Sequence, residues 1–279
     1  MSRKKSTDMM PRSRKLLGLM EDNWSKFRKT VNKRWSKFQE GKAKLIPTKK
    51  TSGLVLGSGY FGIVMATSDE RLVFKITSDE DEGYLSELIL KDPDLRCNKG
   101  LPYLFDVFRI PEWQAYVILR ENVQYGLDIL PDSSPLTRSI PILDQYGDRF
   151  LKIESDVVKM LNALDDIHEE LTPQDFDFAL KESLGAIRIE IIKTLKRLPK
   201  TSTKSKYYYA MSVIRYILDR YGIALWDLHE LNLGRHKYDM QELDENAPPL
   251  DKKAVLILDV GGNFGSPILE KLIPKESIK

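Results

Sequence analysis

Short apolar runs separated by turn residues predict an antiparallel sheet in the first half of the chain. Three such runs lie between residues 51 and 76, interrupted by a glycine-rich segment and by the polar residues 69–71. Two more lie at residues 103–108 and 114–119, and the apolar spacing of residues 80–90 predicts a helix before them. This half of the chain is therefore expected to be a five-stranded sheet with one helix.

The second half of the chain predicts mainly helices. Apolar residues recur every three or four positions in residues 151–167, 176–198 and 207–221. Gly222 follows the last of these helices, and glycine readily takes the left-handed conformation that ends a helix. Residues 254–260 form an apolar run typical of a buried strand, and the polar residues 235–253 predict a loop inserted between two short strands.

The first 50 residues carry a separate pattern. Residues 1–15 are polar and basic and are expected to be disordered. An amphipathic helix is then predicted from an apolar stripe at Met20, Trp24, Phe27, Val31, Trp35 and Phe38. We expect three domains: a basic tail and helix at 1–50, a sheet lobe at 51–122 and a helical lobe at 123–279.

Charge is distributed unevenly along the chain. Residues 1–50 hold 16 lysines and arginines against four acidic residues, whereas the whole chain has a net charge of only +3. The apolar stripe could pack on the rest of the protein and leave the basic face in solvent. Residues 12–50 could instead bind nucleic acid or an acidic protein through that face, or lie on a membrane surface.

The glycine-rich segment follows the pattern G-x-G-x-x-G-x-V from Gly57 to Val64. Apolar residues flank it on both sides, which predicts strand, turn and strand, and no helix follows as it would in a dinucleotide-binding fold. Glycines at such a turn let backbone N–H groups approach phosphate oxygens, and Lys75 on the next strand could reach the same phosphates.

Two later segments supply oxygen ligands and a base. Asp227, His229 and Asn232 lie within six residues, and Asp259 ends the last apolar run before Gly261. An aspartate can orient an attacking hydroxyl, and carboxylate and amide oxygens can hold Mg²⁺.

In this order the motifs resemble the protein-kinase-like fold, over residues 51–268. Residues 73–75 look like the V-A-I-K strand, residues 222–232 like the catalytic loop and residues 259–261 like D-F-G. The D-x-H-x-x-N loop is similar to that of aminoglycoside and choline phosphotransferases. The nearest resemblance is to the early serine/threonine kinase of short-tailed bacteriophages, which shares this loop and a segment similar to residues 100–107.

The resemblance implies an α+β, two-lobed fold that is truncated after D-x-G, and it assigns roles. Asp227 is the expected base, with His229 bracing its loop or meeting phosphate charge, and Asn232 and Asp259 are the expected Mg²⁺ ligands. Glu87 is the expected partner of Lys75, with Glu82 as the alternative. The expected ATP contacts are Gly57, Ser58, Gly59, Gly62, Val64, Lys75, Leu119 and Glu121, the last two at a hinge formed by residues 119–122.

Some features depart from the family. Trp226 stands where many protein kinases have an arginine that pairs with a phosphorylated activation loop, which argues against that form of switching. Only 20 residues follow Asp259, and 26 separate it from Asn232. The usual peptide-docking platform is therefore not expected.

The composition is consistent with a cytoplasmic enzyme, in a bacterial host if the chain is phage-encoded. Cys97 is the only cysteine, which excludes an intramolecular disulfide, and no apolar run predicts a transmembrane segment or a signal peptide. With three histidines and one cysteine, a structural zinc site is not expected.

The leading hypothesis is an ATP- and Mg²⁺-dependent serine/threonine protein kinase acting on host proteins. Two alternatives remain: a kinase for small molecules, and a kinase-fold binding protein whose basic arm inhibits a host nucleic-acid enzyme.

Overall fold

The computed structural model describes residues 10–36, 44–46, 54–59, 61–125, 201–225 and 232–260. It is a mixed α+β structure. Its helices are α1 (Pro11–Asp22), α2 (Trp24–Arg34), α3 (Glu80–Lys91), α4 (Pro93–Arg96), α7 (Tyr208–Tyr221) and the 3-10 turns η4 (Pro111–Trp113) and η8 (Met240–Glu242). Its strands are β1 (Val55–Ser58), β2 (Gly62–Ala66), β3 (Leu72–Thr77), β4 (Leu104–Ile110), β5 (Ala115–Glu121), β6 (Gln124–Tyr125), β7 (Leu233–Arg235) and β8 (Leu256–Ile257).

The chain divides into two compact units. The first comprises residues 1–124 and 236–252, and the second comprises residues 125–235 and 253–279. The basic N-terminal segment, predicted as a domain of its own, thus belongs to the same unit as the sheet. The inserted segment 236–252 also belongs to that unit, although it lies in the half of the sequence predicted to be helical.

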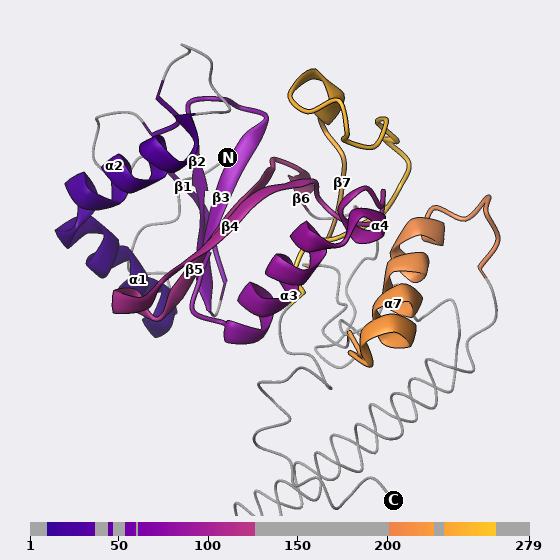
Figure 1. Ribbon diagram of the computed structural model, residues 1–279, viewed down its shortest axis with the longest axis horizontal. Coiled ribbons are helices and arrows are strands. Elements are labelled where there is room, and N and C mark those ends of the chain that lie inside the picture. The colour runs from indigo at the N-terminus through magenta and orange to yellow at the C-terminus, as the bar shows by residue number, and fades with distance from the viewer. Residues whose placement is uncertain are drawn as a thin grey trace, which may run out of the picture. The chain divides into compact units, whose positions relative to one another are not determined.

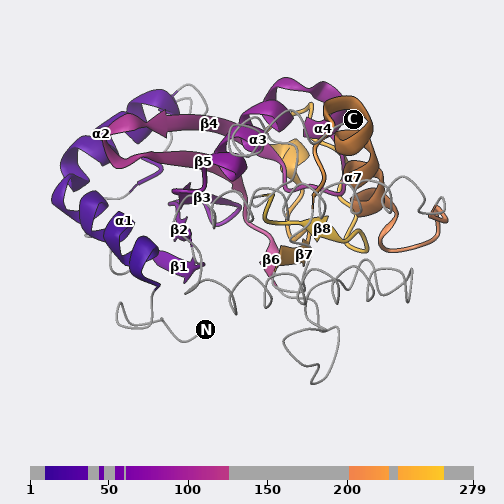
Figure 2. The same ribbon diagram turned by 90° about the horizontal axis from the view of Figure 1, so that it is seen from below.

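The first unit is built on a five-stranded antiparallel sheet in the order β1-β2-β3-β5-β4. Figure 2 shows these strands in that order, from β1 at the bottom to β4 at the top. The five strands and the helix α3 that were predicted from the apolar runs are all present, with ends shifted by a few residues.

Helices cover both faces of this sheet. Figure 1 shows α1 and α2 on one side of it and α3 on the other. All six residues of β3 are buried, because strand side chains alternate between the two covered faces. The face under α1 and α2 carries Ile63, Met65, Phe74 and Ile76, which share one apolar core with the helices.

The predicted amphipathic stripe packs into this core. Met20, Phe27, Val31 and Trp35 are each at most 2% exposed, and the Phe27 and Trp35 rings lie about 6 Å from the ring of Phe74. Two details of the prediction are wrong: the helix begins at Pro11, within the part predicted to be disordered, and it is interrupted at Asn23. Phe38 lies outside the described residues.

The inserted segment 236–252 is packed onto the first unit. Met240 and Ala247 enter the same core as the sheet, and the Asp244 carboxylate accepts hydrogen bonds from Tyr103 (2.6 Å) and Arg96 (3.0 Å). Burial first, and then the bond to Asp244, raises the pKa of the Tyr103 phenol. The segment was predicted as a polar loop, and its few apolar residues account for the packing that the prediction missed.

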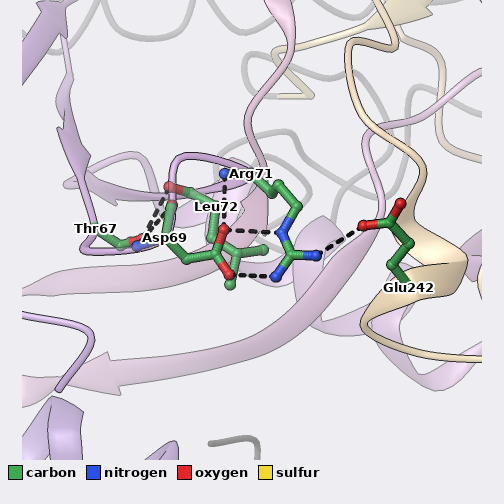
Figure 3. A network of polar contacts seen from close by, with 5 residues as sticks. All are labelled: Thr67, Asp69, Arg71, Leu72 and Glu242. Carbon is green, nitrogen blue, oxygen red and sulfur yellow. Dashed lines mark hydrogen bonds and ion pairs between the residues drawn. The ribbon is translucent and has the colours of Figure 1, made fainter. Parts of the chain in front are cut away.

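A second set of contacts ties this segment to the β2–β3 turn (Figure 3). The Arg71 guanidinium binds both carboxylate oxygens of Asp69, at 2.9 and 2.7 Å, and its remaining nitrogen donates to Glu242 at 3.0 Å. The Thr67 hydroxyl closes the turn by donating to the Asp69 carbonyl at 2.7 Å. These contacts join the β2–β3 turn to η8, although Arg71 and Glu242 are 171 positions apart in the sequence.

The described part of the second unit contains α7 and the antiparallel strands β7 and β8. Helix α7 matches the prediction for residues 207–221, and Gly222 after it has φ of +67°, as expected for its left-handed position. Residues 151–198, predicted as two helices, lie outside the described residues. Within the described ranges, no helix is long and apolar enough to cross a membrane.

Candidate functional site

The glycine-rich segment forms the predicted hairpin. Strands β1 and β2 pair antiparallel, and the Gly59 N–H donates to the Gly62 carbonyl at 2.9 Å to close the turn. A Cβ added at Gly62 would lie 2.6 Å from the Ile76 carbonyl oxygen, so packing against β3 requires glycine there. At Gly57 and Gly59, by contrast, an added Cβ would meet nothing within 4 Å, and neither residue has a left-handed φ.

Lys75 lies on β3 and makes a buried ion pair with Glu82 of α3. The Lys75 Nζ lies 2.5 Å from Glu82 Oε1, and the two side chains are 10% and 3% exposed. The prediction that Glu87 is the partner of Lys75 is wrong. The Glu87 carboxylate is 36% exposed and pairs instead with Lys91, one turn along the same helix, at 3.4 Å.

The geometry of α3 explains why Glu82, and not Glu87, pairs with Lys75. Glu82 lies in its first turn, where the Asp79 side chain caps the helix by accepting from the N–H groups of Asp81 (2.9 Å) and Glu82 (3.3 Å). Glu87 comes five residues later, about 140° around the helix axis. Leu85 and Ile89, which lie three and seven residues after Glu82, are buried with it on one face of α3, and Glu87 lies off that face.

A glycine lets α3 approach the sheet closely. A Cβ added at Gly83 would lie 2.1 to 2.5 Å from ring atoms of Tyr116 on β5. Because any side chain there would push the helix outward, Gly83 sets the distance across which its neighbour Glu82 reaches Lys75.

The remaining predicted nucleotide contacts of the first unit divide into two groups. Val64 is the cross-strand partner of Lys75, so both side chains lie on the same face of the sheet. Leu119 and Glu121, predicted at a hinge, are instead within β5, and the division between the units falls after Gln124. Leu119 is buried in the core, and the Glu121 N–H donates to the Tyr103 carbonyl at 2.9 Å.

The Glu121 side chain belongs to a buried polar cluster that the sequence did not predict. His236, from the inserted segment, places Nδ1 2.9 and 3.0 Å from the two carboxylate oxygens and Nε2 3.1 Å from the Lys99 carbonyl. The Tyr103 N–H also donates to this carboxylate, at 3.2 Å. Since both ring nitrogens face acceptors, both contacts are hydrogen bonds only when the imidazole is doubly protonated. Glu121 therefore anchors the inserted segment.

In the second unit, Asn232 and Asp259 are brought together by β7 and β8. Leu233 pairs with Ile257, and the Leu258 N–H donates to the Asn232 carbonyl at 2.7 Å, which places Asn232 beside the residue preceding Asp259. Both side chains are partly exposed and both carry oxygen atoms. This pair has the ligand chemistry of Mg²⁺, and the 26 residues between the two do not separate them in space.

The predicted catalytic residues Asp227 and His229 lie outside the described residues, as does Trp226. A scan against protein-family models finds no match to this chain, and a search of curated proteins finds none either.

Proposed function

We propose that the protein is an ATP- and Mg²⁺-dependent phosphotransferase of protein-kinase-like fold. The observation that carries this proposal is the buried Lys75–Glu82 pair behind a glycine-rich hairpin. Burying two charges is costly, and an apolar pair of similar size is often at least as stable. A lysine buried there, beside a hairpin whose Gly57 and Gly59 are not required by packing, is better explained by phosphate binding than by stability.

The roles follow from chemistry. Hairpin N–H groups and Lys75 bind the phosphates of ATP, Glu82 holds Lys75 in place, and Asn232 and Asp259 hold Mg²⁺, which neutralises charge on the transferring phosphoryl group. Asp227 orients the acceptor hydroxyl. Most of the rate acceleration comes from positioning and charge neutralisation, because phosphoryl transfer needs little covalent help from the protein.

The acceptor in this proposal is a serine or threonine of a protein, acted on in the cytoplasm of a bacterial host. The exposed basic residues of α1 and α2 support this choice, since their apolar faces are packed on the sheet while Arg14, Lys15, Lys29 and Lys33 face solvent. Such a basic face attracts acidic proteins by long-range electrostatics.

The test incubates the full chain with γ-labelled ATP, Mg²⁺ and a bacterial lysate. Labelled phosphoserine or phosphothreonine in protein bands is the expected result, and Lys75→Met should abolish it. Lys91→Met is the matched control, because it removes a lysine that is exposed and paired only on the surface of α3. Label in small molecules would change the acceptor class, and no transfer by the wild-type chain would refute the proposal.

A further inference from the structure

Helix α1 contacts the turn of the glycine-rich hairpin through a buried hydroxyl. The Ser13 side chain is fully buried, and its Oγ lies 2.6 Å from the Gly59 carbonyl oxygen and 3.0 Å from the Gly62 carbonyl oxygen. A hydroxyl has one proton, so Ser13 shares it between the two carbonyls. Because Gly62 also accepts from the Gly59 N–H, Ser13 bridges the two ends of the turn.

Further contacts hold the same turn. The Arg12 guanidinium lies over the ring of Phe61, 5.0 Å from its centroid. Ser78 directly follows the end of β3 that pairs with Gly62, and its N–H and hydroxyl donate to the Phe61 carbonyl at 2.9 and 3.0 Å. The carbonyls of Gly59, Phe61 and Gly62 are thus all bound by groups of the first unit.

The bound carbonyls of Gly59, Phe61 and Gly62 restrain the peptide planes to which they belong. The peptide group is planar and trans, so fixing the direction of a C=O also fixes the N–H on the other side of that plane. Helix α1 is itself anchored, because Leu16, Leu17 and Met20 are buried in the core that contains Ile63 of β2. Ser13 therefore acts from a rigid element on a turn that glycine would otherwise leave free to change conformation.

We propose that Ser13 is a positioning residue of the nucleotide site. It holds the peptide planes of the glycine-rich turn in one orientation, so that their N–H groups are arranged before a phosphate arrives. This inference rests on the proposed function for the identity of the ligand, but its structural part stands on the hydrogen bonds alone. It makes the N-terminal helix part of the nucleotide site rather than only an arm that recruits substrate.

The test compares Ser13→Ala with two other variants of the full chain. Ser13→Thr keeps the hydroxyl. Leu17→Ala lies one turn further along α1, is buried in the same core and destabilises the helix without removing a hydrogen bond to the turn. Two measurements are made: amide hydrogen exchange of Gly59 by NMR, and the KM for ATP with kcat, alongside ATP·Mg²⁺ affinity by calorimetry.

In Ser13→Ala the Gly59 amide should exchange about two- to tenfold faster, and the KM for ATP should rise by a similar factor with kcat nearly unchanged, as loss of one hydrogen bond predicts. Ser13→Thr should remain near wild type. Leu17→Ala should lower global stability yet leave both quantities near wild type.

Equal Gly59 exchange in Ser13→Ala and wild type would overturn the inference, as would an equal rise in KM in Leu17→Ala. If the wild-type chain bound no nucleotide, the proposed function and the nucleotide part of the inference would both fail. Faster Gly59 exchange in Ser13→Ala would then still establish that Ser13 holds the turn.

Discussion

The same substitution, glutamate to glutamine, should lower the free energy of unfolding far more at Glu82 than at Glu87, although both residues lie on α3. Glu82→Gln removes a negative charge from a pair whose residues are 8% and 2% exposed, Lys75 and Glu82 respectively. Taking away one partner of such a buried pair costs about 3–5 kcal/mol. A domain is stable by about 5–15 kcal/mol in total, so Glu82→Gln should remove a large fraction of it.

Glu87→Gln is the matched control. Its partner Lys91 is 76% exposed, and a solvent-exposed pair one helical turn apart contributes about 0.3–0.5 kcal/mol. Urea denaturation of the two variants and the wild type, followed by fluorescence, measures both losses. The expected difference between the two variants is therefore at least about 2 kcal/mol.

A double variant separates stability from function. The double variant with Lys75→Met and Glu82→Leu removes both buried charges, and it should recover most of the stability that Glu82→Gln loses. It should not restore the wild-type affinity for ATP, because the lysine is gone. Equal losses of stability in Glu82→Gln and Glu87→Gln, or wild-type ATP affinity in the double variant, would refute this account of Lys75.

Three further predictions concern the packing of the first unit. Gly83→Ala should destabilise by about 1–3 kcal/mol because its Cβ overlaps an aromatic ring, whereas Gly18→Ala, with nothing within 4 Å, should stabilise by up to about 1 kcal/mol; thermal melting of the pair checks both. Asp244→Asn should lose about 1–3 kcal/mol at neutral pH, since it removes the charged acceptor of Tyr103. Burial alone would raise the pKa of Asp244, but its hydrogen bonds and the nearby Arg96 lower that pKa below the ordinary 3.8. The contribution of Asp244 to stability is therefore present at neutral pH and lost on acidification. Urea denaturation at pH 7 and at pH 3 should show the stabilities of the variant and the wild type converging at the lower pH. Trp35→Ala should cost about 3–5 kcal/mol by emptying a fully buried site in the core under α2, and an unchanged denaturation midpoint would show that the N-terminal helices do not belong to this unit.

Elements with a strong local signal were predictable from the sequence. The hairpin around the glycines, the strand that contains Lys75 and the helix ending at Gly222 follow from apolar spacing and from glycine at turns and helix ends. Packing of the aromatic stripe on the rest of the protein was one of three alternatives that the sequence left open, and Met20, Phe27, Val31 and Trp35 are buried in this way.

Contacts between distant segments could not be predicted in the same way. Whether Glu82 or Glu87 meets Lys75 depends on which face of α3 is turned toward the sheet, where Gly83 lies close to the ring of Tyr116. The Glu121–His236 pair joins residues 115 positions apart and leaves no periodic signal. Ser13 and the glycine-rich turn are likewise brought together only by the fold.

The central claim, that the chain binds ATP with Mg²⁺ through Lys75 and Asp259, is tested most directly by isothermal titration calorimetry. ATP is titrated into the full chain with Mg²⁺ and with chelator, using wild type, Lys75→Met, Asp259→Asn and Glu87→Gln. We predict Mg²⁺-dependent binding by wild type and Glu87→Gln, weaker binding by Lys75→Met, and loss of the Mg²⁺ dependence in Asp259→Asn. Absence of binding by the wild type, or equal affinity in all four proteins, would contradict the account.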